Sequence, residues 1–137
     1  MVALTKDRDT PRKHGELFSP GVAADVKIFL GSLVVLNVEG YAQPGTTATG
    51  LVALGRAESS VDNTGGVNGE VDAPVRSGVF RFENSAGGDL VSIANVGDDC
   101  FIVDDQTVAL TNGGGTRSVA GTITDVDADG VWVRVGI

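Results

Sequence analysis

The chain has 137 residues and a mass of 14.0 kDa, which is enough for one domain with a single core. Valine, isoleucine and threonine together outnumber leucine by 37 to 9, and this excess of β-branched side chains excludes a helical bundle. The net charge of −8 argues against direct nucleic-acid binding, and no apolar run reaches the roughly 20 residues that a membrane-spanning helix needs.

The first sixteen residues differ from the rest of the chain in charge and in pattern. Four basic and three acidic residues give them a net charge of +1, which leaves −9 for residues 17–137. They show no apolar periodicity, and no apolar stretch that would mark a secretory signal. We therefore predict an extended N-terminal arm over residues 1–17, which either frays in solvent or becomes ordered when it lies on a partner.

Short apolar runs separated by turn residues begin after this arm. In the first half of the chain they predict strands within residues 26–30, 32–38 and 49–57. Residues 59–69 are polar and rich in glycine, so they predict an exposed loop between strands.

The second half of the chain continues the same spacing. In residues 78–83, apolar and charged side chains alternate, which is the mark of a half-buried strand. Residues 90–94 fit either a strand or a single helical turn. Further strands are predicted at 71–76, 100–103, 107–110, 118–126 and 131–135, the last two forming a hairpin.

Together these elements predict an all-β fold. We expect a small single-domain β-barrel or β-sandwich of about eight or nine short strands over residues 18–137, preceded by the arm. No internal repeat of 20–50 residues is present.

The turn of the last hairpin carries the motif closest to a metal site. Asp125, Asp127 and Asp129, followed by Gly130, match the front half of a calcium-binding loop. The twelfth position of such a loop should be a bidentate Glu, but it is Gly136 here, and the flanks are strands rather than helices. We favour a solvated hairpin turn, with the three aspartates as candidate calcium ligands, and expect no cofactor.

Other clusters of chemically active residues have simpler explanations. Asp98-Asp99 and Asp104-Asp105 lie beside predicted turns, without a nearby His or Lys in sequence. Residues 112–117 resemble a phosphate-binding loop but lack its Lys and its spacing. His14 is the one histidine, and Cys100, the one cysteine, excludes an internal disulfide and is expected to be an inert core thiol. We therefore expect no catalytic site.

Three stretches of the chain resemble a known protein family. Residues 22–42, 100–108 and 120–133 are similar, in order and in spacing, to segments of the capsid decoration (cement) proteins of tailed bacteriophages. The resemblance extends from about His14 to the end of the sequence.

The resemblance implies a structural virion protein without enzymatic activity. Members of this family form β-rich homotrimers on the outer surface of the icosahedral head, at or near its three-fold positions. There they bridge neighbouring subunits of the major capsid protein and stabilise the head. We accordingly expect this protein, made in the host cytoplasm, to be located on the capsid of the virion and to bind neither membrane nor nucleic acid.

We expect the arm to make the capsid contact, because it combines mixed charge, a proline and no periodicity. The candidate contact residues are Lys6, Arg8, Pro11, Arg12, Lys13 and Phe18.

Two other functions remain open. A carbohydrate-binding or adhesive β domain would share the glycine-rich, β-rich composition, but sugar sites need an exposed aromatic ring, and Trp132 and Tyr41 are the main candidates beyond five Phe. A hydrolase would have to be built around His14 and Cys100.

Overall fold

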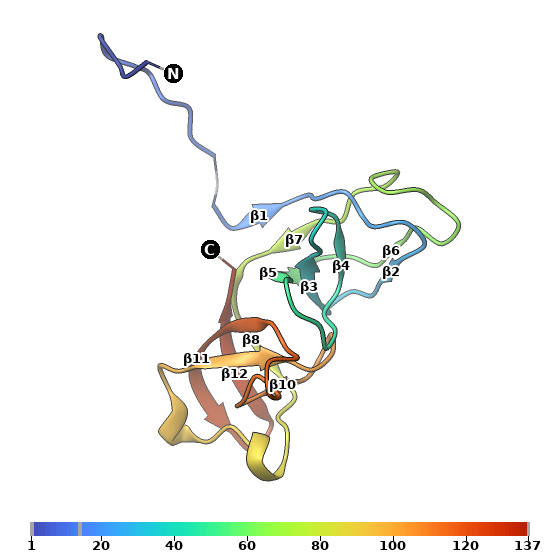
Figure 1. Ribbon diagram of the computed structural model, residues 1–137, viewed down its shortest axis with the longest axis vertical. Coiled ribbons are helices and arrows are strands. Elements are labelled where there is room, and N and C mark those ends of the chain that lie inside the picture. The colour runs from blue at the N-terminus through green and yellow to red at the C-terminus, as the bar shows by residue number, and fades with distance from the viewer. Residues whose placement is uncertain (1, 14, 137) are drawn as a thin grey trace.

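Figure 1 shows the computed structural model of the chain, which describes residues 2–13 and 15–136. Within these ranges the chain forms twelve β-strands and two short 3₁₀ helices, η1 (Gly87–Asp89) and η2 (Ile93–Asn95). The prediction of an all-β fold is confirmed. We call residues 15–136 the body and residues 2–13 the N-terminal segment.

The strands of the body form two five-stranded antiparallel sheets and a two-stranded ribbon. The first sheet has the order β1 (Leu17–Phe18), β7 (Val75–Arg76), β5 (Val52–Ala57), β3 (Leu33–Leu36) and β4 (Ala42–Pro44). The second sheet has the order β10 (Val108–Ala109), β9 (Asp99–Ile102), β11 (Val119–Asp127), β12 (Gly130–Val135) and β8 (Gly78–Phe82). The ribbon pairs β2 (Lys27–Ile28) with β6 (Val61–Asp62).

Strand β3 is buried on both faces, which explains its uninterrupted apolar sequence. Leu33 and Val35 point to one side and join a core cluster built mainly from the second sheet. Val34 points to the other side and packs with Ile28 of the ribbon in a second cluster. The first sheet therefore lies between the second sheet and the ribbon.

The second sheet supplies most of the larger core cluster. Val131, Val133 and Val135 of β12 are fully buried, while Trp132 and Arg134 lie on the opposite face. This alternation is the one predicted from the sequence. The two edge strands of the sheet, β10 and β8, meet at one end in a parallel bridge between Thr107 and Glu83, so the sheet curls into a barrel that is closed at that end.

Two glycines mark places where neighbouring backbones approach too closely for a side chain. A Cβ on Gly55 would overlap the carbonyl of Arg76 in β7, and one on Gly121 would overlap the carbonyl of Arg134 in β12. Both glycines lie where the strand register shifts, between β3 and β5 and between β9 and β11. Such bulges need glycine because a larger residue would force the strands apart.

The structure has more strands than the eight or nine expected. Three short strands, β1, β4 and β6, were not predicted, because a strand of two or three residues is too short to show a periodic pattern in the sequence. The expected exposed loop at residues 59–69 is wrong in part: it contains β6 and the buried Asn63. The Nδ2 of Asn63 donates to the carbonyls of Val22, Ala23 and Val67, so this side chain folds the loop around itself.

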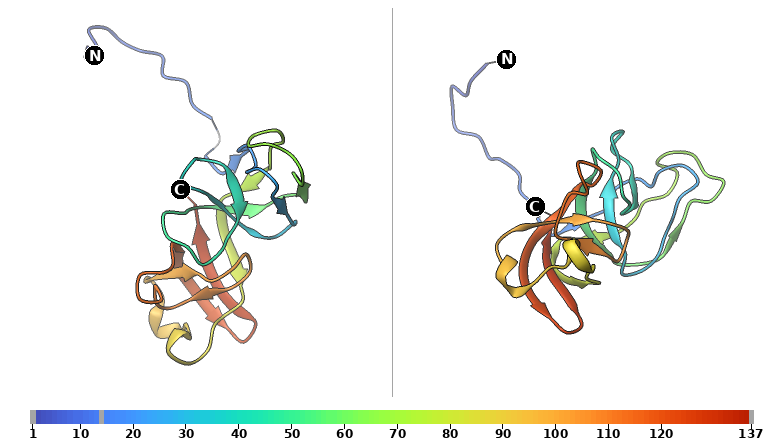
Figure 2. Two further views of the ribbon diagram at one scale, coloured as in Figure 1. Left: turned by 45° about the vertical axis from the view of Figure 1, so that its right-hand side comes forward. Right: turned by 60° about the horizontal axis from the view of Figure 1, so that its bottom comes forward.

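Residues 90–94 and the N-terminal segment contain no strand. Between residues 90 and 94 the chain enters the helical turn η2, in which Ser92 and Asn95 cap each other, so the helical alternative was the correct one. The N-terminal segment has exposed side chains. Figures 1 and 2 show it leading away from the body in every view.

Candidate functional site

The N-terminal segment carries four of the predicted contact residues as free cations. Arg8 donates from Nη1 to Oγ1 of Thr10 at 2.7 Å, and this is the only side-chain hydrogen bond among residues 2–13. In the described part of the chain, none of Lys6, Arg8, Arg12 and Lys13 pairs with a carboxylate. Their charge is therefore available to a partner.

The segment is rooted in the body through β1, a strand that the sequence did not reveal. The N–H of Ser77 donates to the carbonyl of Glu16 at 2.8 Å, and Leu17 and Phe18 pair with β7. The Glu16 carboxylate also lies 3.5 Å from Arg76. Phe18, expected at the end of the arm, is thus a partly buried residue of the first sheet.

An ion-pair cluster on the first sheet stabilises this root. Glu58 lies 2.9 Å from Arg56 and 3.4 Å from Arg76, while Arg76 also reaches Glu16. The hydrogen bond from Arg56 holds the pKa of Glu58 below its ordinary value, with Arg76 adding to the effect. These arginines are occupied by the fold, in contrast with the cations of the N-terminal segment.

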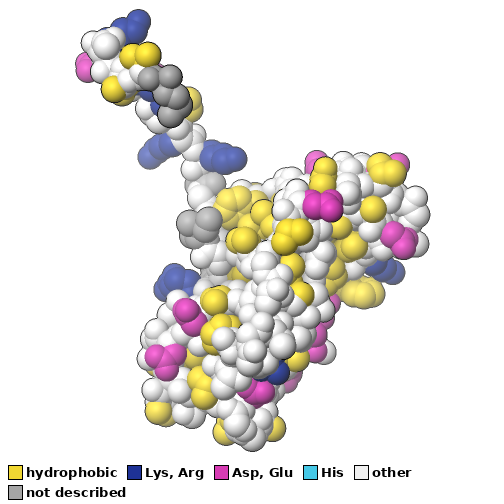
Figure 3. Space-filling view, in the orientation of Figure 1, with side chains coloured by type: hydrophobic (Ala, Val, Ile, Leu, Met, Phe, Trp, Pro, Cys, Tyr) yellow, Lys and Arg dark blue, Asp and Glu magenta, His cyan; other side chains and the backbone are white. Residues whose placement is uncertain are grey.

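An apolar groove of about 550 Å³ opens beside the root. Leu17, Phe18, Pro20, Leu36 and Leu54 line it, and Lys13 lies at its rim. Figure 3 shows hydrophobic side chains gathered on the body where the segment leaves it. The root of the segment therefore combines an apolar surface with neighbouring positive charge.

The acidic hairpin turn uses its carboxylates for contacts within the protein. The Oδ1 of Asp127 accepts from the N–H groups of Asp129 and Gly130 at 2.8 and 3.1 Å, and its Oδ2 accepts from Nε1 of Trp132 at 2.9 Å. Asp125 accepts from the next backbone N–H, and Asp129 lies 3.9 Å from an arginine. In the described residues, no group of three or more His, Cys, Asp and Glu side chains could hold a metal ion. The hairpin-turn interpretation accounts for these carboxylates.

Trp132 lies on the outer face of the second sheet. Its ring stands 5.7 Å from the guanidinium of Arg81, the residue opposite it on β8, and its indole N–H is bound to Asp127. The donation from Trp132 is the main cause that lowers the pKa of Asp127, and the N–H of Asp129 contributes. The ring is partly exposed, as the aromatic ring of a sugar site would have to be.

The remaining candidates lie apart from one another. Cys100 is buried in the second sheet, and burial raises the pKa of its thiol to about 12. Asp104 accepts from the N–H of Gln106 within its own turn, while burial and the neighbouring Asp104 raise the pKa of Asp105. His14 lies outside the described residues. Nothing in the described chain brings these groups to one site.

The glycine-rich stretch 112–117 contains one arginine, Arg117, and this side chain binds other residues of the protein. The Nη1 of Arg117 donates to the Oδ1 of Asp89 at 3.2 Å and to the carbonyl of Thr111 at 3.0 Å. The cation that a phosphate would need is therefore occupied by the fold.

Comparison with known proteins identified no relative: no family model, no curated protein and no solved structure matches the chain. None of the described residues belongs to a helix with the length and apolar character that a membrane span requires.

Proposed function

We propose that this protein is a structural virion protein that binds the outer surface of an icosahedral phage head. In this proposal it acts as a homotrimer near the three-fold positions, bridging neighbouring subunits of the major capsid protein. The proposal rests on the resemblance of three stretches of the sequence to phage decoration proteins. The geometry of the N-terminal segment supports it.

The observation that carries the proposal is the contrast between the segment and the body. Residues 2–13 hold four unpaired cations against two acidic residues, so their net charge is +2. With −8 for the whole chain, −10 remains for all other residues. A cationic, exposed segment attached to an acidic body suits a protein that grips one surface and repels its other neighbours.

Trimerisation would strengthen this grip. One segment of twelve residues offers a small contact area, whereas three linked segments raise the effective concentration of each at its site. A trimer at a three-fold position would also place one segment on each of three surrounding subunits. We therefore expect binding to depend on all three copies.

The test is co-sedimentation of the protein with purified empty heads. Replacing Lys6, Arg8, Arg12 and Lys13 together with Ser should reduce binding at least tenfold and make the remaining binding insensitive to salt. A control for the loss of positive charge replaces two cations of the body, Lys27 and Arg134, with Ser and should bind like the unaltered protein, and the segment variant Arg12→Ser with Lys13→Ser loses the same charge and should bind more weakly. Equal binding by these two double variants would contradict the role of the segment, and no binding by the unaltered protein would contradict the function.

The surroundings of Trp132 favour carbohydrate binding as a second candidate function. Its partly exposed ring lies beside Asp127 and Arg81. A glycan array probed with the unaltered protein and with Trp132→Ala tests this possibility. Specific glycan signals that are lost in the variant would support it, and silence on the array combined with binding to heads would exclude it.

A further inference from the structure

The second sheet has an unpaired edge along β8. Within the described residues, Gly78–Phe82 of this strand pair with β12 alone. Just before β8, the N–H of Ser77 donates to the carbonyl of Glu16 at 2.8 Å. Just after β8, the N–H of Glu83 donates to the carbonyl of Gln106 at 2.7 Å. Alternate residues of a strand direct their N–H groups to the same side. The N–H groups of Val79 and Arg81 therefore point to the same side of β8 as those of Ser77 and Glu83. No hydrogen bond within the described chain reaches the N–H groups of Val79 and Arg81 there.

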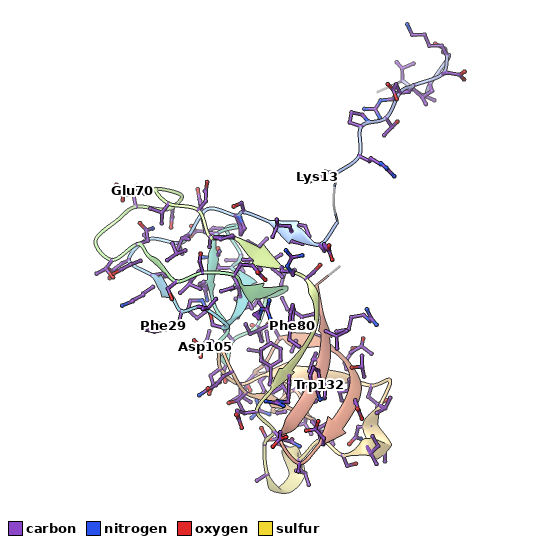
Figure 4. The ribbon with its side chains drawn as sticks, turned by 180° about the vertical axis from the view of Figure 1, so that it is seen from behind. Lys13, Phe29, Glu70, Phe80, Asp105 and Trp132 are labelled. Atoms are coloured by element: carbon purple, nitrogen blue, oxygen red, sulfur yellow. The ribbon has the colours of Figure 1, made fainter. Side chains whose placement is uncertain are left out.

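The open side of β8 borders a groove of about 310 Å³. Gly31 and Arg56 form its opposite wall, with the Arg56 guanidinium 4.6 Å from the centre of the Phe80 ring. At Gly31 the groove continues into a second hollow of about 380 Å³, lined by Phe29 and Leu30, which are 57% and 64% exposed. Figure 4 shows Phe29 and Phe80 at this side of the body. An extended chain placed here would find both backbone donors and apolar side chains.

The N-terminal segment contains a stretch that matches such a groove. Val2 and Leu4 are 91% and 71% exposed, and because they are two positions apart they would point to the same side of an extended chain. In the described structure these residues have no strand partner. Residues 2–5 are therefore an apolar stretch without a sheet, and β8 is a sheet edge that could accept a further strand.

The ladder between β1 and β7 indicates that the segment does not simply continue along β8 of its own chain. Leu17 lies opposite Arg76 and Phe18 opposite Val75. Extending this register would place Arg12 opposite Arg81, and two like charges directly opposite each other destabilise a strand pair. In the structure the segment leaves the body instead (Figure 2).

The charges and the length of the segment suit a neighbouring copy. The segment carries +2 and the remainder of the chain −10, so a segment is attracted to the body of another copy. Residues 6–15 form a tether of ten residues, which spans up to roughly 35 Å when extended. This length is sufficient to reach the surface of an adjacent body of this size.

We propose that residues 2–5 of one copy add as a strand to the β8 edge of a second copy. The backbone pairs with Val79 and Arg81, while Val2 and Leu4 enter the groove beside Phe80 and Phe29. Each copy gives one strand and receives one, so the contact is head-to-tail, and it forms a ring of identical subunits where the rotation between copies closes. This inference goes beyond the proposed function, because it does not depend on what the assembly binds.

The test measures the native mass of the full chain in solution without any capsid. We expect the unaltered protein to have a multiple of 14.0 kDa, three copies if the ring is the proposed trimer. Val79→Pro removes one edge N–H without touching the pairs with β12 and should give the mass of a single chain. Val79→Thr keeps the N–H and should remain assembled.

The donor strand is tested with variants of equal charge. Val2→Asp with Leu4→Asp places two carboxylates in the groove and should yield single chains. Ala3→Asp with Thr5→Asp places them on the opposite side of the strand and should leave the assembly intact. An equal mixture of the Val79→Pro protein and the Val2→Asp, Leu4→Asp protein retains one intact donor and one intact edge, so it should form a pair.

Amide hydrogen exchange provides a readout that does not depend on the folding of the proline variant. The N–H groups of Val79 and Arg81 should be protected in the unaltered protein and exchange at least tenfold faster in the Val2→Asp, Leu4→Asp variant. A single-chain mass for the unaltered protein would overturn the proposal. If these amides were protected in such a single chain, the segment would dock within its own chain, and the proposal would be overturned as well. Full assembly of folded Val79→Pro protein would also overturn it.

Discussion

The body and the N-terminal segment use the same kinds of residue with opposite results. Val131 and Val133 of β12 are fully buried, whereas Val2 and Leu4, which have the same spacing of two residues, are 91% and 71% exposed. The difference is the partner: β12 lies between β8 and β11, and the segment has no neighbouring strand in the described structure. Apolar residues two positions apart are thus buried only where a neighbouring strand covers them.

The two regions therefore differ in which of their side chains remain available to a partner. The body holds both core clusters, and four of its five arginines are engaged in ion pairs within the fold. The segment keeps its cations and apolar side chains available. Substitutions of buried residues in the body should therefore alter stability, and substitutions in the segment should alter association.

The largest difference between the two regions should appear in thiol reactivity. Burial raises the pKa of Cys100 from 9.0 to about 12, so its thiolate fraction near pH 8 falls by about a thousandfold. A thiol introduced by Thr5→Cys, in a Cys100→Ser background, should react with a disulfide reagent at the rate of a free thiol. Comparing the two rates, with denatured protein as the control, measures the contrast. Similar rates would show that the second sheet opens as readily as the segment.

The next effect is on the free energy of unfolding. Ile123 is fully buried in the cluster of the second sheet, so Ile123→Ala should lower this free energy by about 2–5 kcal/mol. Thr5→Ala removes an exposed side chain that does not enter the proposed groove and should change it by less than about 0.5 kcal/mol. Urea titration followed by circular dichroism checks both. A comparable loss in the two variants would mean that the segment belongs to the core.

A polar residue of the body should give a smaller loss. Asn63→Ala removes a buried amide that donates to the carbonyls of Val22, Ala23 and Val67 and should destabilise the protein by about 1–3 kcal/mol. Asn112→Ala, in an exposed loop, is the matched control. Equal stability of the two variants would show that the loop around Asn63 contributes nothing to the fold.

The sequence predicted the strands whose pattern is local. Residues 78–83 and 131–135 alternate clearly because one face of each strand meets the core, and both became strands as expected. The strand β6 escaped prediction because two residues cannot show a period, and its pairing depends on β2, more than thirty residues earlier. Asn63 escaped because an asparagine among glycines has the composition of any exposed loop.

The candidate site was predictable to a similar extent. The charge of the segment is visible in the sequence, and the carboxylates of the hairpin were correctly expected to serve a turn. The free edge of β8 was not visible, because strand order is set by contacts between distant segments rather than by local pattern. Phe18 was placed in the arm for the same reason: its partner in β7 lies 57 positions further along the chain.

The smallest effect concerns acid titration of the hairpin turn, and it probes a local feature of the body. Hydrogen bonds from Trp132 and from the N–H of Asp129 lower the pKa of Asp127 below its ordinary value of 3.8. A carboxyl whose pKa is lowered by folding adds stability above its unfolded pKa, and this contribution is lost as the pH falls through the lower, folded value.

Trp132 is the single tryptophan, so its fluorescence reports on this contact. Its emission should change with a midpoint below pH 3.8. Asp127→Asn should abolish the transition, while Asp125→Asn should preserve it. A midpoint at or above pH 3.8 would show that the indole bond does not hold Asp127 in its charged form.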